Sequence, residues 1–274
     1  MNNNVPNQDI LNAFSVSGEP ILLTGGEGNC YRVDNLVLKP TRNSIESSWI
    51  AEINNTLENK KFRIPKPIKA KDGLWVYNAY VANEYLEGSV QKGKYIEAIK
   101  ISKEFHKSLL NIPKPDWFDK KEDVFAVADR MAWGEMPVHD YQVANEPLKI
   151  IFNLLKKNHL PSQLIHGDWG PEQILFHETL SPVILDMTPY FRPAEYPIAD
   201  MLISAIVNDG ADISIIDLGK DIKDFDQLLL RAFIFRICTY IGFQVHPKNN
   251  FDWTKKISKY LNFSNILIKL IKDK

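Results

Sequence analysis

Cysteine is scarce in this sequence: Cys30 and Cys238 are the only two among 274 residues, and they lie far apart. Two distant cysteines do not form the disulfide framework of a small secreted domain, and they fit a reducing compartment. Net charge is equally low, at −1, so no overall basic field attracts nucleic acid or a membrane surface. We therefore expect neither of these as a partner.

Long apolar runs are also missing. The most apolar stretch, residues 228–243, is interrupted by Arg231 and Arg236 and falls short of the ~20 apolar residues of a membrane span. The opening segment MNNNVPNQDILNAF lacks the basic and apolar regions of a secretory signal. Since 45% of the residues are hydrophobic and 24% charged, the composition is that of an ordinary globular protein. We expect a cytoplasmic protein that is a monomer or a weak dimer.

The sequence does contain a distinctive stretch at residues 164–190, LIHGDWGPEQILFHETLSPVILDMTPY. An apolar pair leads into His166, Gly167 and Asp168, a polar turn and a short apolar run follow, and a second apolar run ends on Asp186. This pattern predicts a loop, a strand, a turn and a second strand, with a carboxylate at each end. Because buried strands do not need aspartate at their ends, the two carboxylates indicate a site that binds a metal or abstracts a proton.

The chain before this stretch has the pattern of antiparallel strands. Residues 20–39 predict a three-stranded meander with Gly25, Gly26 and Gly28 in its first turn. Glycines at a hairpin tip let backbone N–H groups approach an anion such as a phosphate, although a turn without a ligand uses the same residues. Lys39 ends the third strand and is the candidate side chain for the phosphates.

A helix is predicted at residues 44–58, with Ser44 as its N-cap. Glu46 and Glu52 on this helix are the candidate ion-pair partners of Lys39, and we favour Glu52 because it lies farther along the helix. Strands at 73–77 and 80–86 follow an extended, proline-punctuated connector, and we place a lobe boundary near residues 84–90. The helices expected after it span residues 93–111, 121–133, 145–158, 195–208, 224–243 and 252–271.

The order of these features matches phosphoryl transfer from a nucleotide. The glycine loop would cover the phosphates, Lys39 would neutralise them, and a helix glutamate would hold the lysine extended. Asp168 would orient or deprotonate an attacking hydroxyl, and Asp186 would bind Mg²⁺. No single feature decides the function, but their joint order and spacing are hard to obtain by chance.

The stretch also resembles the signature of the aminoglycoside phosphotransferase and choline-kinase-like family, which shares the protein-kinase fold. That signature is His-Gly-Asp, four residues, Asn, an apolar run, a short hairpin and an apolar strand that ends in Ile-Asp; here it reads HGDWGPEQILF and then VILDMTP. The segment FRPAEY at residues 191–196, followed by Asp200, and the segment EFHK at 104–107 are similar to the family as well. The resemblance covers roughly residues 20–210.

The resemblance implies an α+β, protein-kinase-like fold of two lobes. A nucleotide-binding lobe with a small antiparallel sheet and one helix would occupy residues 1–87, and a mainly helical catalytic and substrate-binding lobe residues 88–274. ATP or GTP with Mg²⁺ would serve as co-substrate, and a hydroxyl of a small molecule would be the acceptor.

The resemblance also assigns roles to residues. Asp168 is the implied catalytic base, and Asp186 and Gln173 are the implied metal ligands. His166 and Asp200 would support the catalytic loop without carrying protons. The implied nucleotide-binding residues are Gly25, Gly26, Gly28, Lys39, Glu52, Asn83, Glu84 and Tyr85, the last three from an interlobe hinge at residues 83–86.

One position departs from the family pattern, since Gln173 stands where the family has asparagine. Glutamine keeps the amide but places its oxygen about 1.5 Å farther out. If the site tolerates this, the protein is a small-molecule kinase; if not, it is a catalytically weak or inactive nucleotide-binding relative. Glu172 could supply a substitute oxygen. A protein kinase proper fits least, because the sequence lacks the His-Arg-Asp, Asp-Phe-Gly and Ala-Pro-Glu landmarks.

The acceptor is not fixed by the sequence, because a fold hosts many substrates. A cationic acceptor would favour acidic residues beside Asp168. The candidates are Glu135, Asp140, Glu172, Glu195, Asp209 and Asp212, but a near-neutral chain has acidic residues throughout.

Overall fold

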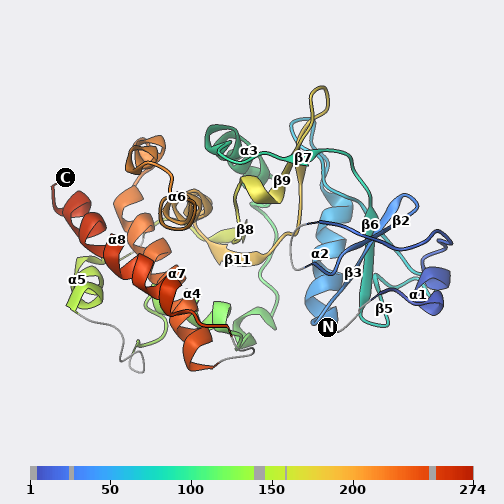
Figure 1. The fold of residues 1–274 in the computed structure, drawn as a ribbon, viewed down its shortest axis with the longest axis horizontal. Coiled ribbons are helices and arrows are strands. Elements are labelled where there is room, and N and C mark those ends of the chain that lie inside the picture. The colour runs from blue at the N-terminus through green and yellow to red at the C-terminus, as the bar shows by residue number, and fades with distance from the viewer. Residues whose placement is uncertain (1–4, 25–27, 139–145, 158, 247–250, 274) are drawn as a thin grey trace. The chain divides into compact units, whose positions relative to one another are not determined.

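The computed structural model describes residues 5–24, 28–138, 146–157, 159–246 and 251–273 (Figure 1). Contacts divide the chain into two compact units. The first unit holds Met1–Lys94 and Pro171–Met187, and the second holds Tyr95–Gly170 and Thr188–Lys274. The hairpin at 171–187 thus belongs by its contacts to the first unit. The lobe division expected after residue 87 stays a prediction.

A six-stranded antiparallel sheet forms the centre of the first unit, in the order β1-β2-β3-β6-β4 with β5 also on β6. Its strands are β1 (Ile21–Leu22), β2 (Tyr31–Val33), β3 (Leu36–Pro40), β4 (Pro67–Ile68), β5 (Val76–Tyr77) and β6 (Tyr80–Glu84). The predicted meander is confirmed, and β4 lies in the connector that was expected only to be extended. The short helix α1 (Gln8–Ala13) packs Ile10 and Leu11 against Val33, Leu38 and Ala82 of the sheet.

The predicted helix after β3 is α2 (Ser44–Thr56), but its N-cap is Asn43 rather than Ser44. The Asn43 side chain accepts a hydrogen bond from the Glu46 backbone N–H at 3.1 Å, which satisfies one of the free donors of the first turn. At the other end, the Lys66 ammonium group donates to the carbonyl oxygens of Asn54, Asn55 and Leu57 at 3.3, 3.1 and 2.7 Å. A cation at this end also complements the helix dipole.

The predicted strand–turn–strand is confirmed within the first unit. A single 3₁₀ turn, η2 (Pro171–Gln173), leads into β9 (Ile174–Phe176), which pairs antiparallel with β10 (Val183–Ile184) and, on its other side, with β7 (Ser89–Val90). The sequence did not predict β7. Gly88 before it has φ +155°, and a Cβ there would lie 2.7 Å from Leu175 Cβ, so the close approach requires glycine.

Helices dominate the second unit, as predicted. They are α3 (Tyr95–Ser108), α4 (Val124–Ala132), α5 (Glu146–Leu154), α6 (Tyr196–Asp209), α7 (Phe225–Val245) and α8 (Thr254–Lys272), with 3₁₀ turns η1 (Phe118–Lys120) and η3 (Ile213–Gly219). By length and composition alone α7 is apolar enough to cross a membrane, but 78% of its most apolar window is buried inside the protein. It is a core helix, in contact with α4, α6 and α8 (Figure 1).

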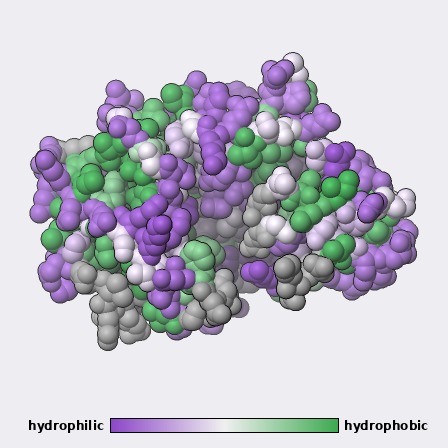
Figure 2. Space-filling view, viewed as in Figure 1, coloured by the Kyte–Doolittle hydropathy of each residue, from purple (hydrophilic) through white to green (hydrophobic). Residues whose placement is uncertain are grey.

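A two-stranded sheet in the second unit was not predicted. β8 (Gln163–His166) pairs antiparallel with β11 (Pro189–Arg192), so that His166 lies opposite Pro189. The apolar pair before His166, expected to lead into a loop, is part of β8. On the face of the molecule in Figure 2, apolar residues appear as several separate groups among hydrophilic ones, as on an ordinary protein surface.

The Lys66 cap leads to a stability prediction. Lys66→Met removes a cation that serves three helix-end carbonyls, so we expect it to lower the free energy of unfolding by about 1 kcal/mol in urea titrations. Lys71→Met is the matched control, because it removes the same charge from an exposed side chain nearby. Equal stability of the two variants would contradict the capping role.

Candidate functional site

Backbone packing explains why glycine follows His166 in the predicted catalytic loop. The Gly167 N–H donates to the Thr188 carbonyl at 2.7 Å, which extends the pairing of β8 and β11. A Cβ on Gly167 would lie 2.0 Å from Cδ2 of the buried Tyr190 ring, so no other residue fits without displacing that ring. Gly167 therefore allows the loop to turn against Tyr190 and to present Asp168.

His166 is fully buried, and its hydrogen bonds join segments of the loop. Its Nδ1 accepts from the backbone N–H groups of Asp168 at 3.3 Å and Thr188 at 3.5 Å, so Nε2 carries the proton. Its own backbone N–H donates to Nε2 of His106 on α3 at 3.1 Å. Nδ1 of His106 then faces the Ser102 hydroxyl at 3.0 Å.

The His106 ring must be neutral to accept that bond. Burial, followed by the electrostatic effect of nearby His166, lowers the pKa of His106 to about 3. A neutral ring with its proton on Nδ1 leaves Nε2 free to accept, which matches the observed contacts. The pair of histidines thus ties the start of the loop to α3.

Trp169 fixes the loop on the other side of Asp168. Its Nε1–H donates to the Ala98 carbonyl of α3 at 3.2 Å, and its ring stacks on Phe105 with centroids 5.7 Å apart. Trp169 is 1% exposed, whereas the Asp168 side chain is 47% exposed. The loop is therefore anchored at both sides of one accessible carboxylate.

Asp200 is buried on α6, and its partner is Arg236 on α7. The guanidinium donates from Nε at 2.8 Å and from Nη2 through a second, shorter bond. Burial raises the pKa of Asp200, and Arg236 opposes that rise. Nη2 of Arg236 also lies 3.6 Å from Oδ1 of Asp168. Asp200 therefore reaches the loop through Arg236, a residue that the sequence reading did not assign to the site.

In the first unit, Lys39 at the end of β3 contacts Asp186 directly, with Nζ 2.7 Å from Oδ1. Their side chains are 33% and 44% exposed, so the pair is a weak, solvent-accessible one. Asp186 has a left-handed backbone with φ +46°, which few residues other than glycine adopt. The Leu185 N–H donates to the Gln173 carbonyl at 2.9 Å, which places Gln173 across the hairpin from the residue before Asp186.

The two candidate partners of Lys39 differ in exposure. Glu46 is half-buried on α2, whereas Glu52, which the sequence favoured, is exposed. The helix therefore turns Glu46, more than Glu52, away from solvent. The pairing of either glutamate with Lys39 stays a prediction.

The remaining nucleotide-binding residues also stay predictions. Gly25 and Gly26 lie outside the described residues, and Gly28 has a left-handed φ of +66°. Asn83 pairs with Val37 and Pro67 within the sheet.

Glu84 and Tyr85 likewise use their backbone N–H groups within the first unit. Glu84 donates to the Lys66 carbonyl at 2.8 Å and Tyr85 to the Asn35 carbonyl at 2.7 Å. If these N–H groups bound the base of a nucleotide, that contact would have to replace the two backbone hydrogen bonds.

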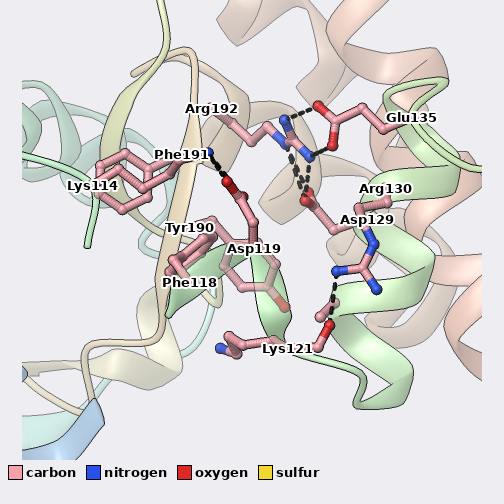
Figure 3. Close-up of a pocket in the computed structure, with 11 residues that line it drawn as sticks. Lys114, Phe118, Asp119, Lys121, Asp129, Arg130, Glu135, Tyr190, Phe191 and Arg192 are labelled. Carbon is pink, nitrogen blue, oxygen red and sulfur yellow. Dashed lines mark hydrogen bonds and ion pairs between the residues drawn. The ribbon is translucent and has the colours of Figure 1, made fainter. Parts of the chain in front are cut away.

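A small pocket in the second unit borders Tyr190 (Figure 3). Its aromatic wall is Phe118, Tyr190 and Phe191. Beside it, the Arg192 guanidinium donates three hydrogen bonds to the Asp129 carboxylate and two to the Glu135 carboxylate. Burial works against the charge of Arg192, but these two carboxylates outweigh it and raise its pKa. The lining balances four basic against three acidic side chains, so it shows no preference for a cationic acceptor.

Two of the acidic candidates for a cationic acceptor have other partners, and a third lies outside the described residues. Glu135 is paired with Arg192, Asp212 caps η3 through the Ser214 N–H, and Asp140 lies outside the described residues. Three or more His, Cys, Asp or Glu side chains arranged to hold a metal are not found in the described part of the chain.

No protein-family model matches the chain, and no curated protein matches it. Solved structures do. The choline kinase LicA from Streptococcus pneumoniae has a TM-score of 0.62 and 8% identity over 94% of this chain and 97% of that one. The AMP-bound spectinomycin phosphotransferase APH(9)-Ia has a TM-score of 0.61 and 10% identity over 96% of each chain. The GDP complex of aminoglycoside 2'-phosphotransferase-IIIa has a TM-score of 0.56 and 14% identity over 93% of each.

The chain therefore has the fold of the aminoglycoside phosphotransferases and choline kinases. This confirms the predicted α+β, protein-kinase-like class and, at the level of fold, the resemblance that the loop sequence indicated. At identities this low, the likeness does not transfer a substrate or a residue role.

The neutral His106 makes stability depend on pH. Its folded pKa of about 3 lies below the unfolded value, so the unfolded state binds more protons and stability falls as the pH drops from about 6.5 towards 3. His106→Gln keeps an acceptor near Nε2 but does not titrate. We expect the loss of unfolding free energy between pH 7 and pH 5 to be smaller by about 2 kcal/mol in this variant. Parallel pH curves from urea unfolding would contradict this.

The left-handed backbone of Asp186 can be tested separately from its charge. Asp186→Gly and Asp186→Ala both remove the pair with Lys39, but only glycine adopts φ +46° without strain. We expect the glycine variant to be more stable by about 1 kcal/mol in thermal or urea unfolding. An alanine variant of equal or greater stability would show that the backbone relaxes.

Proposed function

We propose that this protein is a phosphotransferase that moves the γ-phosphoryl group of ATP or GTP to a hydroxyl of a small molecule. The contact between Lys39 and Asp186 carries the proposal. Separate sequence arguments made the lysine a phosphate ligand and the aspartate a metal ligand, and their charged atoms lie 2.7 Å apart although 147 positions separate them in the chain. A nucleoside triphosphate with its Mg²⁺ needs a cation for its phosphates and a carboxylate for its metal, close to each other.

The residues present fit a magnesium ion. Asp186 offers an accessible carboxylate and Gln173 an amide oxygen from the neighbouring turn, and Mg²⁺ prefers such oxygen ligands, with phosphates and waters completing its shell. Bound Mg²⁺ would neutralise charge on the phosphate oxygens. Lys39 would turn from Asp186 to the phosphates when the nucleotide binds.

Asp168 would act on the acceptor. Its carboxylate accepts the proton of the acceptor hydroxyl while that oxygen forms a bond to the γ-phosphorus and the bond from phosphorus to the bridging oxygen breaks. The histidine pair and Trp169 hold the loop so that this carboxylate is presented at little conformational cost. The solved structures of the same fold that contain GDP, ADP or AMP support a nucleotide co-substrate.

The test combines a wide acceptor panel with one conservative variant. We expect radiolabelled ATP or GTP to label at least one acceptor, and Asp168→Asn to lower turnover by roughly 10²–10⁴-fold because the base is lost. Magnesium-dependent nucleotide binding, measured by thermal shift, should survive in the variant. Turnover retained by Asp168→Asn would remove this residue from the reaction.

Gln173 supports one alternative, a nucleotide-binding protein with weak or no catalysis. A longer side chain at the position of the family's asparagine could prevent productive metal binding. Magnesium-dependent nucleotide binding without transfer to any acceptor in the panel would favour this alternative. Labelling of any acceptor well above background would exclude it.

A further inference from the structure

We propose that Arg236 is a positioning residue that holds the Asp168 carboxylate in the orientation needed to receive the acceptor hydroxyl. This inference rests on the proposed function, because it concerns the same reaction. It assigns to α7 a part in the site that the loop sequence does not reveal.

The bonds to Asp200 fix the position of the Arg236 side chain. Its side chain is 17% exposed, and its two bonds go to Asp200, which is completely buried. A planar guanidinium that binds a carboxylate through two nitrogens keeps one geometry, unlike a lysine ammonium. Losing that partner would leave Asp200 charged and buried, so the pair is held firmly.

Nη2 of Arg236, one of the two nitrogens bound to Asp200, also faces the predicted catalytic loop. Nη2 lies 3.6 Å from Oδ1 of Asp168, within range of an ion pair and beyond that of a good hydrogen bond. Two carboxylates therefore share one cation, with the buried one binding it tightly and the accessible one held loosely. The distance limits the directions that the Asp168 carboxylate can take.

Compensation of Asp200 alone does not explain this arrangement. α7 contains a second buried arginine, Arg231, which donates to the Ala132 and Lys156 carbonyl oxygens at 2.9 and 2.7 Å and has no ion pair with a carboxylate in the described residues. Burial of an arginine in this helix thus needs no carboxylate. What distinguishes Arg236 is that the nitrogen bound to Asp200 also lies within ion-pair range of Asp168.

The experiment removes the charge without leaving an unpaired one buried. The double variant Asp200→Asn/Arg236→Gln replaces the ion pair by two amides, and Arg236→Lys keeps the charge but loses the fork. Arg231→Gln is the matched control, because it removes a buried arginine from the same helix. Circular dichroism and unfolding temperature establish that each variant is folded, and kcat and the nucleotide KM are measured for each.

A positioning role predicts that the double variant loses roughly 10- to 100-fold in kcat, while its nucleotide KM stays within about twofold, because a small misplacement of a reacting group is costly. Arg236→Lys should recover part of that loss, and Arg231→Gln should stay within about twofold of wild type. Across the set, kcat should follow the charge at position 236 and not the unfolding temperature.

Two results would overturn the inference, and they differ from failure of the proposed function. A folded double variant with wild-type kcat shows that Arg236 is structural only. A kcat that declines in proportion to unfolding temperature across all variants, Arg231→Gln included, shows the same. If the wild-type protein labels no acceptor, the proposed function fails and the positioning role fails with it.

Discussion

The loop that presents Asp168 depends on one hydrogen bond, from the His166 backbone N–H to the ring of His106. It joins the end of β8 to α3 in a buried place, and only a neutral ring can accept it. Burial makes the charged ring costly and so preserves the acceptor. With Trp169 docked on the same helix and Gly167 against Tyr190, Asp168 is the single residue of 166–170 that is not buried.

In the second unit, two buried aspartates are each paired with an arginine. Asp200 and Asp129 are both buried, and each receives two or more bonds from one guanidinium, Arg236 and Arg192 respectively. Several charge-assisted bonds to one partner offset much of the desolvation that burying a carboxylate costs. The first cluster lies 3.6 Å from Asp168, and the second borders the pocket beside Tyr190. The interior charges therefore shape the region around the loop as well as the core.

Local patterns predicted most of the fold, but contacts between distant segments needed the structure. The meander, α2 and the helices of the second unit follow from periodicity, whereas β8 and β11, which pair with each other, were not predicted as strands. On α2, Ile45 lies four residues before Trp49 but is 64% exposed. The true helix phase turns Glu46 inwards and Glu52 outwards.

The candidate site could be named only in part from the sequence. Motif and strand pattern pick out His166, Asp168 and Asp186 because those features are local, and their roles stay predictions. Arg236 was visible as a charge in an apolar helix, and such a charge needs polar partners. Its partner could not be named, because many acids in the sequence were available and only packing of α6 against α7 selects Asp200.

The pairing of Lys39 with Asp186 has a consequence for how the proposed nucleotide complex would respond to salt. Each charge is already neutralised by the other, so a nucleotide with Mg²⁺ would exchange one ion pair for two others: ammonium with phosphate, and carboxylate with metal. Because ion pairs are present both before and after binding, salt should weaken this binding less than it weakens binding to an isolated, solvated lysine. At this place, affinity would owe more to geometry than to the attraction of a bare positive charge.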